Sequence, residues 1–186
     1  EGLGKLRQYF DRADAMVAGP GLGTEQESHS LVREACKLLK NPVLLDADAL
    51  RPEIVDPLRE KHQLVLTPHA GELTRLCGKQ SVEDYLAAFP GLILLKGPHP
   101  KIVSAGSILH LFSGSSLLAR GGSGDLLSGI IASLMARGER SLCVCVALGA
   151  LWHGRAAEVL ARQHGQEAVT STQILDYLSF ALRNDF

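Results

Sequence analysis

The sequence predicts an α/β fold in which a mostly parallel sheet is covered by helices on both faces and ends in an antiparallel edge hairpin. Short apolar runs alternate with amphipathic helical segments through the first half of the chain. These runs are continuously apolar, which is typical of parallel strands that are buried on both faces. Glycine-rich and polar clusters follow the runs directly, and ligands bind at that edge of an open α/β sheet.

The first half of the chain repeats a strand–helix unit. The helix expected at residues 27–40 has apolar positions 31, 35, 38 and 39, which fall on one face at the helical period. The remaining segments follow the same apolar patterns and turn signals. Helices are expected at residues 3–10, 27–40, 53–60, 72–77 and 82–89, and strands at residues 14–18, 42–45, 64–66 and 92–95.

The second half begins with a hairpin and continues as helices. Residues 101–104 and 108–112 read as two strands joined by a turn at Ala105 and Gly106. Leu127, Ile130 and Leu134 recur at the helical period, so a buried helix is expected from about residue 125 to 137. Two further helices are expected at residues 141–162 and 171–182, and the apolar run 142–152 is expected to be buried.

Composition narrows the class of protein. The 186 residues, 46% hydrophobic and 21% charged, suit a single globular domain over residues 1–186. A net charge of −1 gives no basic surface, so no nucleic-acid partner is expected. No apolar run approaches the roughly 20 residues of a membrane span, so no membrane partner is expected. The four cysteines form no zinc or disulfide pattern, which favours buried thiols, no resident metal and a cytoplasmic location.

The most informative cluster is GGSGD at residues 121–125, where glycines run into a predicted helix. The first backbone N–H groups of a helix have no intrahelical partners, and that end is partially positive. Glycines let such a backbone approach a phosphate closely. Asp125 beside a bound phosphate could take a proton from the attacking group. The alternative is a glycine-rich turn with an aspartate that only caps the helix.

Two clusters nearer the N-terminus leave more than one interpretation open. The GPGLG stretch at residues 19–23 is either a glycine corner over which a ligand lies or a plain turn, and it lacks dinucleotide-fingerprint spacing. Asp46 and Asp48 are two apart in extended chain, so their carboxylates are expected on one face, where they could share Mg²⁺ through water. Capping of the next helix is favoured for Asp48, and Asp46 stays open.

Two further strand ends carry candidate residues. His69 lies in the TPHAGE stretch at residues 67–72, at a loop tip, where a binding histidine and a plain surface histidine are both compatible with the pattern. Glu72 is expected in the first turn of the next helix, where its charge suits the helix dipole. Lys96 follows a strand directly and either reaches into the crevice toward phosphates or is the first solvated residue; the crevice is favoured.

The order GPGLG, LDADAL, TPHAGE, LLKGP and GGSGDLLSGI resembles the C-terminal domain of the YjeF-type proteins, the ADP- or ATP-dependent NAD(P)H-hydrate dehydratases of the ribokinase-like superfamily. The resemblance runs from about Met16 to the C-terminus. TPHxGE together with GGSGD is fairly specific, whereas G-[ST]-G-D alone indicates only the superfamily. The resemblance implies a ribokinase-like fold, and we expect this chain to lack strands that precede Met16 in the family.

The family phosphorylates the ring hydroxyl of hydrated NADH or NADPH and then eliminates phosphate. On this resemblance, Gly21 and His69 would contact the hydrate, and Asp46 is also assigned to substrate binding. Asp125 would contact the hydrate and act as the base toward its hydroxyl. The implied cofactors are ADP or ATP with Mg²⁺, the implied partners are the hydrate and the nucleotide, and a homo-oligomer is expected. Nucleotide binding is assigned to Lys96, Gly97, Pro98, His99, Pro100, Gly122, Ser123 and Gly124.

Two positions depart from the family pattern. Ala70 stands where the family usually has proline, and Pro100 replaces the usual threonine, which removes a hydroxyl and a backbone donor. The alternatives to dehydration are a small-molecule kinase of the same superfamily, with Asp125 as base on a vitamin-precursor alcohol, and a nucleotide-binding homologue without turnover.

Overall fold

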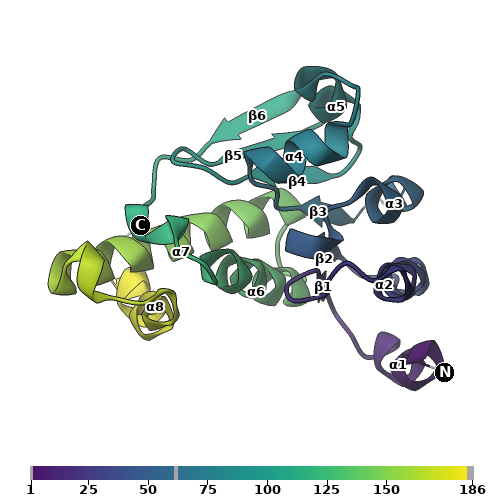
Figure 1. Cartoon of the computed structure of the whole chain (residues 1–186). Helices are drawn as coiled ribbons and strands as arrows, with labels where there is room; N and C mark the ends of the chain where they lie inside the picture. Colours follow the sequence, from purple (N-terminus) through teal and green to yellow (C-terminus); the bar gives the residue numbers. More distant parts are fainter. Residues whose placement is uncertain (1, 61–62, 184–186) are drawn as a thin grey trace.

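The computed structural model describes residues 2–60 and 63–183 and contains a six-stranded mixed sheet (Figure 1). The strands lie side by side in chain order. The first four are parallel, and the last two add an antiparallel hairpin at one edge, which confirms the predicted fold class. The strands are β1 (Met16–Ala18), β2 (Val43–Leu45), β3 (Leu64–Leu66), β4 (Leu92–Leu95), β5 (Lys101–Ser104) and β6 (Ser107–His110).

The helices follow the predicted order, and several bounds shift; the helix predicted at residues 171–182, for example, begins at Ile174 after a 3₁₀ turn. The predicted helix at residues 53–60 divides into α3 and a 3₁₀ turn, because Pro57 has no N–H to continue the α-helical ladder. The predicted helix at residues 125–137 begins two residues earlier, because Gly122 takes the N-cap position. The helices are α1 (Gly2–Phe10), α2 (Gln26–Leu38), α3 (Pro52–Val55), α4 (Ala70–Cys77), α5 (Val82–Ala88), α6 (Ser123–Ala136), α7 (Leu142–His164) and α8 (Ile174–Arg183).

Helices cover both faces of the sheet, as continuous apolar strands require. Alternate residues of a strand point to opposite faces. Val43 and Leu45 therefore pack into a core with α2, α3, α4 and α5, whereas Leu44 packs into a second core with α6 and α7. Figure 1 shows the two helix layers on either side of the strands. The site is built at the carboxyl ends of the parallel strands, where the first turns of α4 and α6 meet the sheet.

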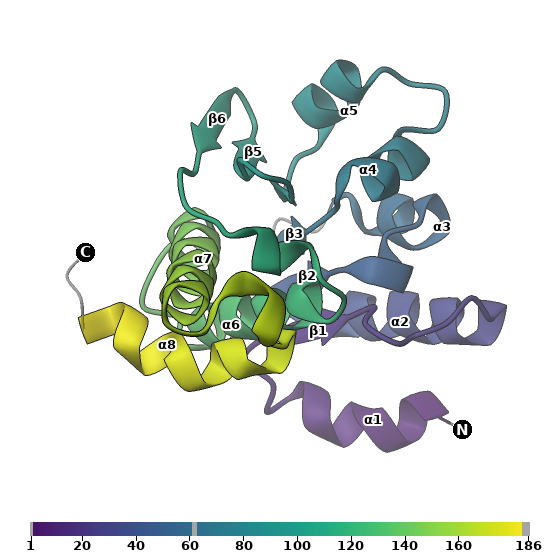
Figure 2. The same cartoon turned by 60° about the vertical axis from the view of Figure 1, so that its left-hand side comes forward.

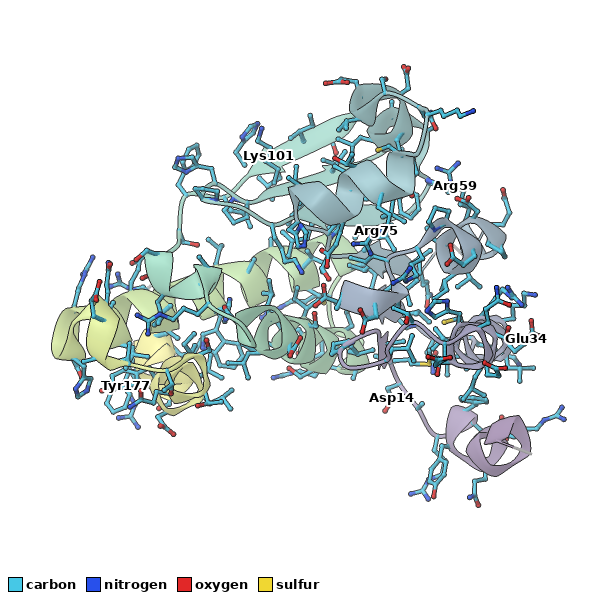
Figure 3. All side chains as sticks on the ribbon, in the orientation of Figure 1. Asp14, Glu34, Arg59, Arg75, Lys101 and Tyr177 are labelled. Carbon is cyan, nitrogen blue, oxygen red and sulfur yellow. The ribbon has the colours of Figure 1, made fainter. Side chains whose placement is uncertain are left out.

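A third apolar cluster joins α7 to α8, two helices that lie side by side in Figure 2. Trp152 Nε1 donates a hydrogen bond to the Leu178 carbonyl across this interface, at 2.7 Å. Tyr177, labelled in Figure 3, lies on α8, and its hydroxyl donates to Gln163 Oε1 at 2.9 Å. These contacts join the middle and the C-terminal end of α7 to α8.

The expectation for the apolar run 142–152 is only partly correct. Cys145 and Val146 are buried, but Val144 is 43% exposed and Cys143 is partly exposed. The helix also continues to His164, and in the part of the chain that the structure describes it is the one helix long and apolar enough to cross a membrane by length and composition. Half of its most apolar 18-residue stretch is buried inside the fold, which is the behaviour of a core helix.

Candidate active site

The carboxyl edge of the sheet holds a buried cluster of charges. Lys96 follows β4, and its Nζ lies 2.6 Å from Asp46 Oδ1, at the end of β2, and 3.7 Å from Glu72 Oε2 on α4. Ser128 on α6 donates a hydrogen bond to Asp46 Oδ2 at 2.7 Å. Asp46 is 1% exposed, and a buried carboxylate is stable only when it is paired in this way. The cluster therefore ties two strand ends to helices on both faces.

Asp46 and Asp48 do not share a face, which corrects the sequence-based expectation. Ala47 has a φ of +49°, and residues 47–49 form a 3₁₀ turn, so the strand alternation stops at Leu45. Asp46 turns toward Lys96, whereas Asp48 Oδ2 accepts a hydrogen bond from the Gly23 N–H at 3.0 Å. Asp48 is therefore an anchor for the glycine corner and not a helix cap.

The glycine corner at residues 19–23 lies directly beside the end of β2. Gly19 has a φ of +126°, and a Cβ there would come within 1.6 Å of the Asp46 carbonyl oxygen. Only glycine allows this approach. At the other end of the corner, His29 Nε2 lies 3.2 Å from the Gly23 carbonyl oxygen. Gly21, between these anchors, is exposed with a φ of +66°, so its backbone faces outward on the tip of the corner.

His69 is the N-cap of α4. Its Nδ1 accepts hydrogen bonds from the backbone N–H groups of Gly71 and Glu72, and Glu72 Oε2 accepts one from the His69 N–H at 2.7 Å. A neutral histidine that accepts at Nδ1 carries its proton on Nε2. Nε2 lies 3.5 Å from Glu72 Oε1, but the side chain is 57% exposed, so solvent or a ligand can also reach Nε2. Glu72 lies in the first turn of the helix, as the sequence predicts.

A cavity of about 750 Å³ opens next to this cluster, between the β4–β5 loop, the segment at residues 113–122 and the first turns of α6. The cavity includes most of the residues expected to bind nucleotide, together with His69. His99 is exposed and is absent from the wall, as are Gly21, Asp46 and Asp125. The wall residues that the sequence indicated are Lys96, Gly97, Pro98, Pro100, Gly122, Ser123, Gly124 and His69.

The start of α6 has the features of an anion site. Gly122 caps the helix with a φ of +82°, and it lines the cavity together with Ser123 and Gly124. A Cβ on Gly124 would lie 3.5 Å from Lys96 Nζ and 3.7 Å from Asp46 Oδ2, so the helix end and the lysine head are neighbours. The positive end of a helix beside an ammonium group attracts phosphate.

Asp125 occupies the third position of α6 and is exposed. It lies one helical turn before Ser128, which bonds Asp46, so the two residues are neighbours on the helix surface. Within residues 2–60 and 63–183, no hydrogen bond or ion pair holds its carboxylate, and the capping position belongs to Gly122. Asp125 is thus a free acid at the positive end of a helix, beside the buried charge cluster.

Several residues of the site escape sequence reasoning. His153 directly follows the apolar run 142–152, and it is 3% exposed and lines the cavity. Burial lowers its pKa from 6.5 to about 4, so the ring is neutral near pH 7. Ser128 lies one helical turn after Gly124, and this position could have indicated that its hydroxyl faces the site. Arg120 donates to the carbonyls of Val169 and Gln166 and so fastens the cavity wall to the segment after α7.

Comparison with known proteins places these features in a family. The family model described as NAD(P)H-hydrate dehydratase matches residues 4–179. The bifunctional NAD(P)H-hydrate repair enzyme Nnr of Moorella thermoacetica is 36% identical over 198 residues, which cover 99% of this chain and 37% of that protein. The Escherichia coli enzyme of the same name is 32% identical over 191 residues, with 95% and 36% covered. The chain thus spans little more than a third of the length of these relatives.

Solved structures agree with the fold. The ADP/ATP-dependent NAD(P)H-hydrate dehydratase from Bacillus subtilis, co-crystallized with ATP and Mg²⁺, superposes with a TM-score of 0.78 at 26% identity, covering 91% of this chain and 64% of that chain. A ribokinase-like superfamily protein from Enterococcus faecalis superposes with a TM-score of 0.80 at 23% identity, covering 96% and 66%. The second likeness supports the ribokinase-like fold alone.

Proposed function

The chain belongs to the NAD(P)H-hydrate dehydratase family, and from that premise we propose that it uses ADP or ATP to convert hydrated NADH or NADPH back to the reduced cofactor. One observation supports this most strongly: a helix start and a lysine line the same cavity, and the helix start carries a carboxylate that has no partner among the residues the structure describes. The relatives are bifunctional and much longer, so the proposal covers the dehydration alone.

The nucleotide would occupy the cavity. Its volume of about 750 Å³ lies in the range of small-molecule sites. The phosphates would lie at Gly122, Ser123 and Gly124, within reach of Lys96, and the base and ribose against the loop of Gly97, Pro98 and Pro100. The Pro100 carbonyl accepts a hydrogen bond from the Leu111 N–H at 2.9 Å, so this loop is anchored although proline lacks the family's threonine hydroxyl.

Mg²⁺ fits this site as a companion of the phosphates. Among the residues that the structure describes, no cluster of three or more His, Cys, Asp or Glu side chains could hold a metal. Mg²⁺ needs only one or two carboxylates when phosphate oxygens and water complete its shell. Glu72 is held by the His69 N–H and by Lys96 and is absent from the cavity wall, so phosphate oxygens and water would supply most of the shell. The ion would neutralise phosphate charge during transfer.

The hydrate would lie between Asp125, His69 and the exposed Gly21. Asp125 takes the proton of the ring hydroxyl as that oxygen bonds the terminal phosphorus, and the nucleotide leaves shortened by one phosphate. In the second step the carbon–oxygen bond breaks, and the neighbouring ring carbon gives its proton to the departing phosphate, which restores the double bond. His69 Nε2–H donates to the hydrate. Asp46 is buried, so we propose that it acts through Lys96.

The assay that tests this function incubates the chain with hydrated NADH, Mg²⁺ and ADP or ATP, and follows the absorbance of NADH. We expect NADH to reappear with at least one nucleotide and not without it. If the chain binds nucleotide but no NADH reappears, it is a nucleotide-binding homologue without turnover. Transfer of phosphate to a vitamin-precursor alcohol in place of recovery would make the chain a kinase of the wider superfamily.

We also propose that the chain forms a homo-oligomer in the cytoplasm. Val144, Leu175, Phe180 and Leu182 on α7 and α8 are 43–55% exposed, and apolar side chains of this size favour an interface. The four cysteines are free thiols, which suits a reducing compartment. Sedimentation of the purified chain measures the assembly; a monomer at micromolar concentration would contradict it.

A further inference from the structure

His153 lies in the cavity wall, and none of the roles above uses it. It comes from the middle of α7 and is 3% exposed. Its Nε2 lies 3.3 Å from the Oγ of Ser123, which is 1% exposed and is the first residue of α6. Two polar groups buried against each other form a hydrogen bond whose loss leaves the remaining group unsatisfied. This contact therefore connects the core helix α7 to the proposed phosphate site.

The first turn of α6 needs such an anchor. Gly122 and Gly124 flank Ser123 and have no side chains, and glycine backbone is conformationally free. The Ser123 N–H donates to the Arg120 carbonyl at 3.3 Å, a long bond. The Ser123 hydroxyl is thus the side-chain tether of a turn whose N–H groups must point at a ligand.

The same part of α7 also touches the opposite wall. A Cβ on Gly154 would lie 2.8 Å from Ser113 Oγ and 3.4 Å from the Gly114 nitrogen. One turn further on, Glu158 Oε1 accepts a hydrogen bond from the Gly114 N–H at 3.2 Å. Since neighbouring residues of one helix contact both walls, α7 sets the spacing across the cavity.

From these contacts, and resting on the proposed nucleotide site, we propose that His153 is a positioning residue: its imidazole holds Ser123 and so fixes the first turn of α6 for the nucleotide phosphates. The ring is neutral near pH 7, so it acts as a hydrogen-bonding group and not as a charge. Glutamine can place an amide near the position of Nε2, whereas leucine keeps the bulk and loses the hydrogen bond. Holding the turn in advance reduces the ordering cost of binding.

The test is titration calorimetry of ATP with Mg²⁺, combined with steady-state kinetics. His153→Leu is expected to weaken ATP binding by about five- to tenfold, the loss of one buried hydrogen bond. His153→Gln is expected to stay within about twofold of the unaltered chain, and the KM for the hydrate is expected to change little in both. Val146→Ala is the matched control, because it removes buried bulk from the same helix outside the cavity wall.

A double-mutant cycle isolates the contact. Ser123→Ala removes the same hydrogen bond from the other side, so Ser123→Ala with His153→Leu is expected to bind ATP no more weakly than either single variant. Should His153→Leu not fold, Ser123→Ala and His153→Gln still measure the contact. Three results would overturn the positioning role. ATP affinity could stay unchanged in the single variants, or the double variant could lose as much affinity as the product of the two single losses. Val146→Ala could also lose as much ATP affinity as His153→Leu. If the unaltered chain binds ADP and not ATP, the same series is measured with ADP; binding of neither nucleotide would instead overturn the nucleotide site itself.

Discussion

At the scale of single residues, the proposed chemistry depends most on Asp125. Its carboxylate is exposed and unpaired among the described residues, so it can accept a proton without breaking an internal contact. Asp125→Asn removes the base and keeps the shape and the helix N–H groups. We expect turnover to fall by at least about 100-fold, the usual size of a general-base contribution, with ATP affinity within about twofold. Full turnover in this variant would remove Asp125 from the mechanism.

His69 has two roles that substitution can separate. His69→Ala removes both the N-cap of α4 and the exposed Nε2–H, whereas asparagine at this position keeps a capping oxygen and lacks that donor. We expect both variants to raise the KM for the hydrate more than the Kd for ATP. Only His69→Ala should also lower the free energy of unfolding, by about 1 kcal/mol. If His69→Asn raised the KM for the hydrate and the Kd for ATP by the same factor, His69 would not be a specific contact of the hydrate.

Burial of His153 predicts a specific pH dependence of stability. The pKa is about 4 in the folded chain and 6.5 in an unfolded one. Between these values the unfolded chain binds a proton that the folded chain does not, so the free energy of unfolding falls as the pH drops from 6.5 to 4, by up to about 3 kcal/mol. Urea unfolding of the unaltered chain and of His153→Gln from pH 4 to 8 measures this. If the free energy of unfolding had the same pH dependence in both chains, the buried neutral ring would be contradicted.

At the scale of elements, the junction of β1 and β2 is the most constrained point. Gly19→Ala would drive a Cβ into the Asp46 carbonyl, 1.6 Å away, at a φ that side chains rarely adopt. We expect a loss of about 3 kcal/mol or more in the free energy of unfolding, or failure to fold. Gly4→Ala is the control, since nothing lies within 4 Å of its Cβ position on α1, and it should stabilise the helix slightly. Equal stabilities in thermal unfolding would contradict the close approach of Gly19 to the end of β2.

The elements themselves were largely predictable from local pattern. Continuous apolar runs such as Leu64–Leu66 and Leu92–Leu95 indicate buried parallel strands, and these strands form where the pattern places them. The errors lie where one residue changes the backbone. Gly122 moves the start of α6, and Ala47, with its positive φ, turns Asp46 and Asp48 apart. Neither conformation has a signal in hydrophobic periodicity.

At the scale of the whole molecule, the sheet edge gathers residues that are distant in sequence. Lys96 and Asp46 are 50 residues apart, and Ser128 and Asp46 are 82 apart. Sequence reasoning could place Asp46 and Lys96 at strand ends on one edge, but it could not pair their atoms or add Ser128 from α6, because that pairing depends on helix packing across both faces. His153 was missed for the same reason: an apolar helical run gives no sign of which residue meets the start of α6.

The central claim is that one site, formed by the cavity and the adjoining start of α6, couples nucleotide cleavage to dehydration of the hydrate. The most direct measurement is the ratio of phosphate released to NADH regenerated from hydrated NADH with Mg²⁺ and ATP or ADP. We predict one phosphate per NADH, with neither product formed when the nucleotide or the hydrate is omitted. Phosphate release without NADH, or NADH recovery that needs no nucleotide, would contradict the coupling.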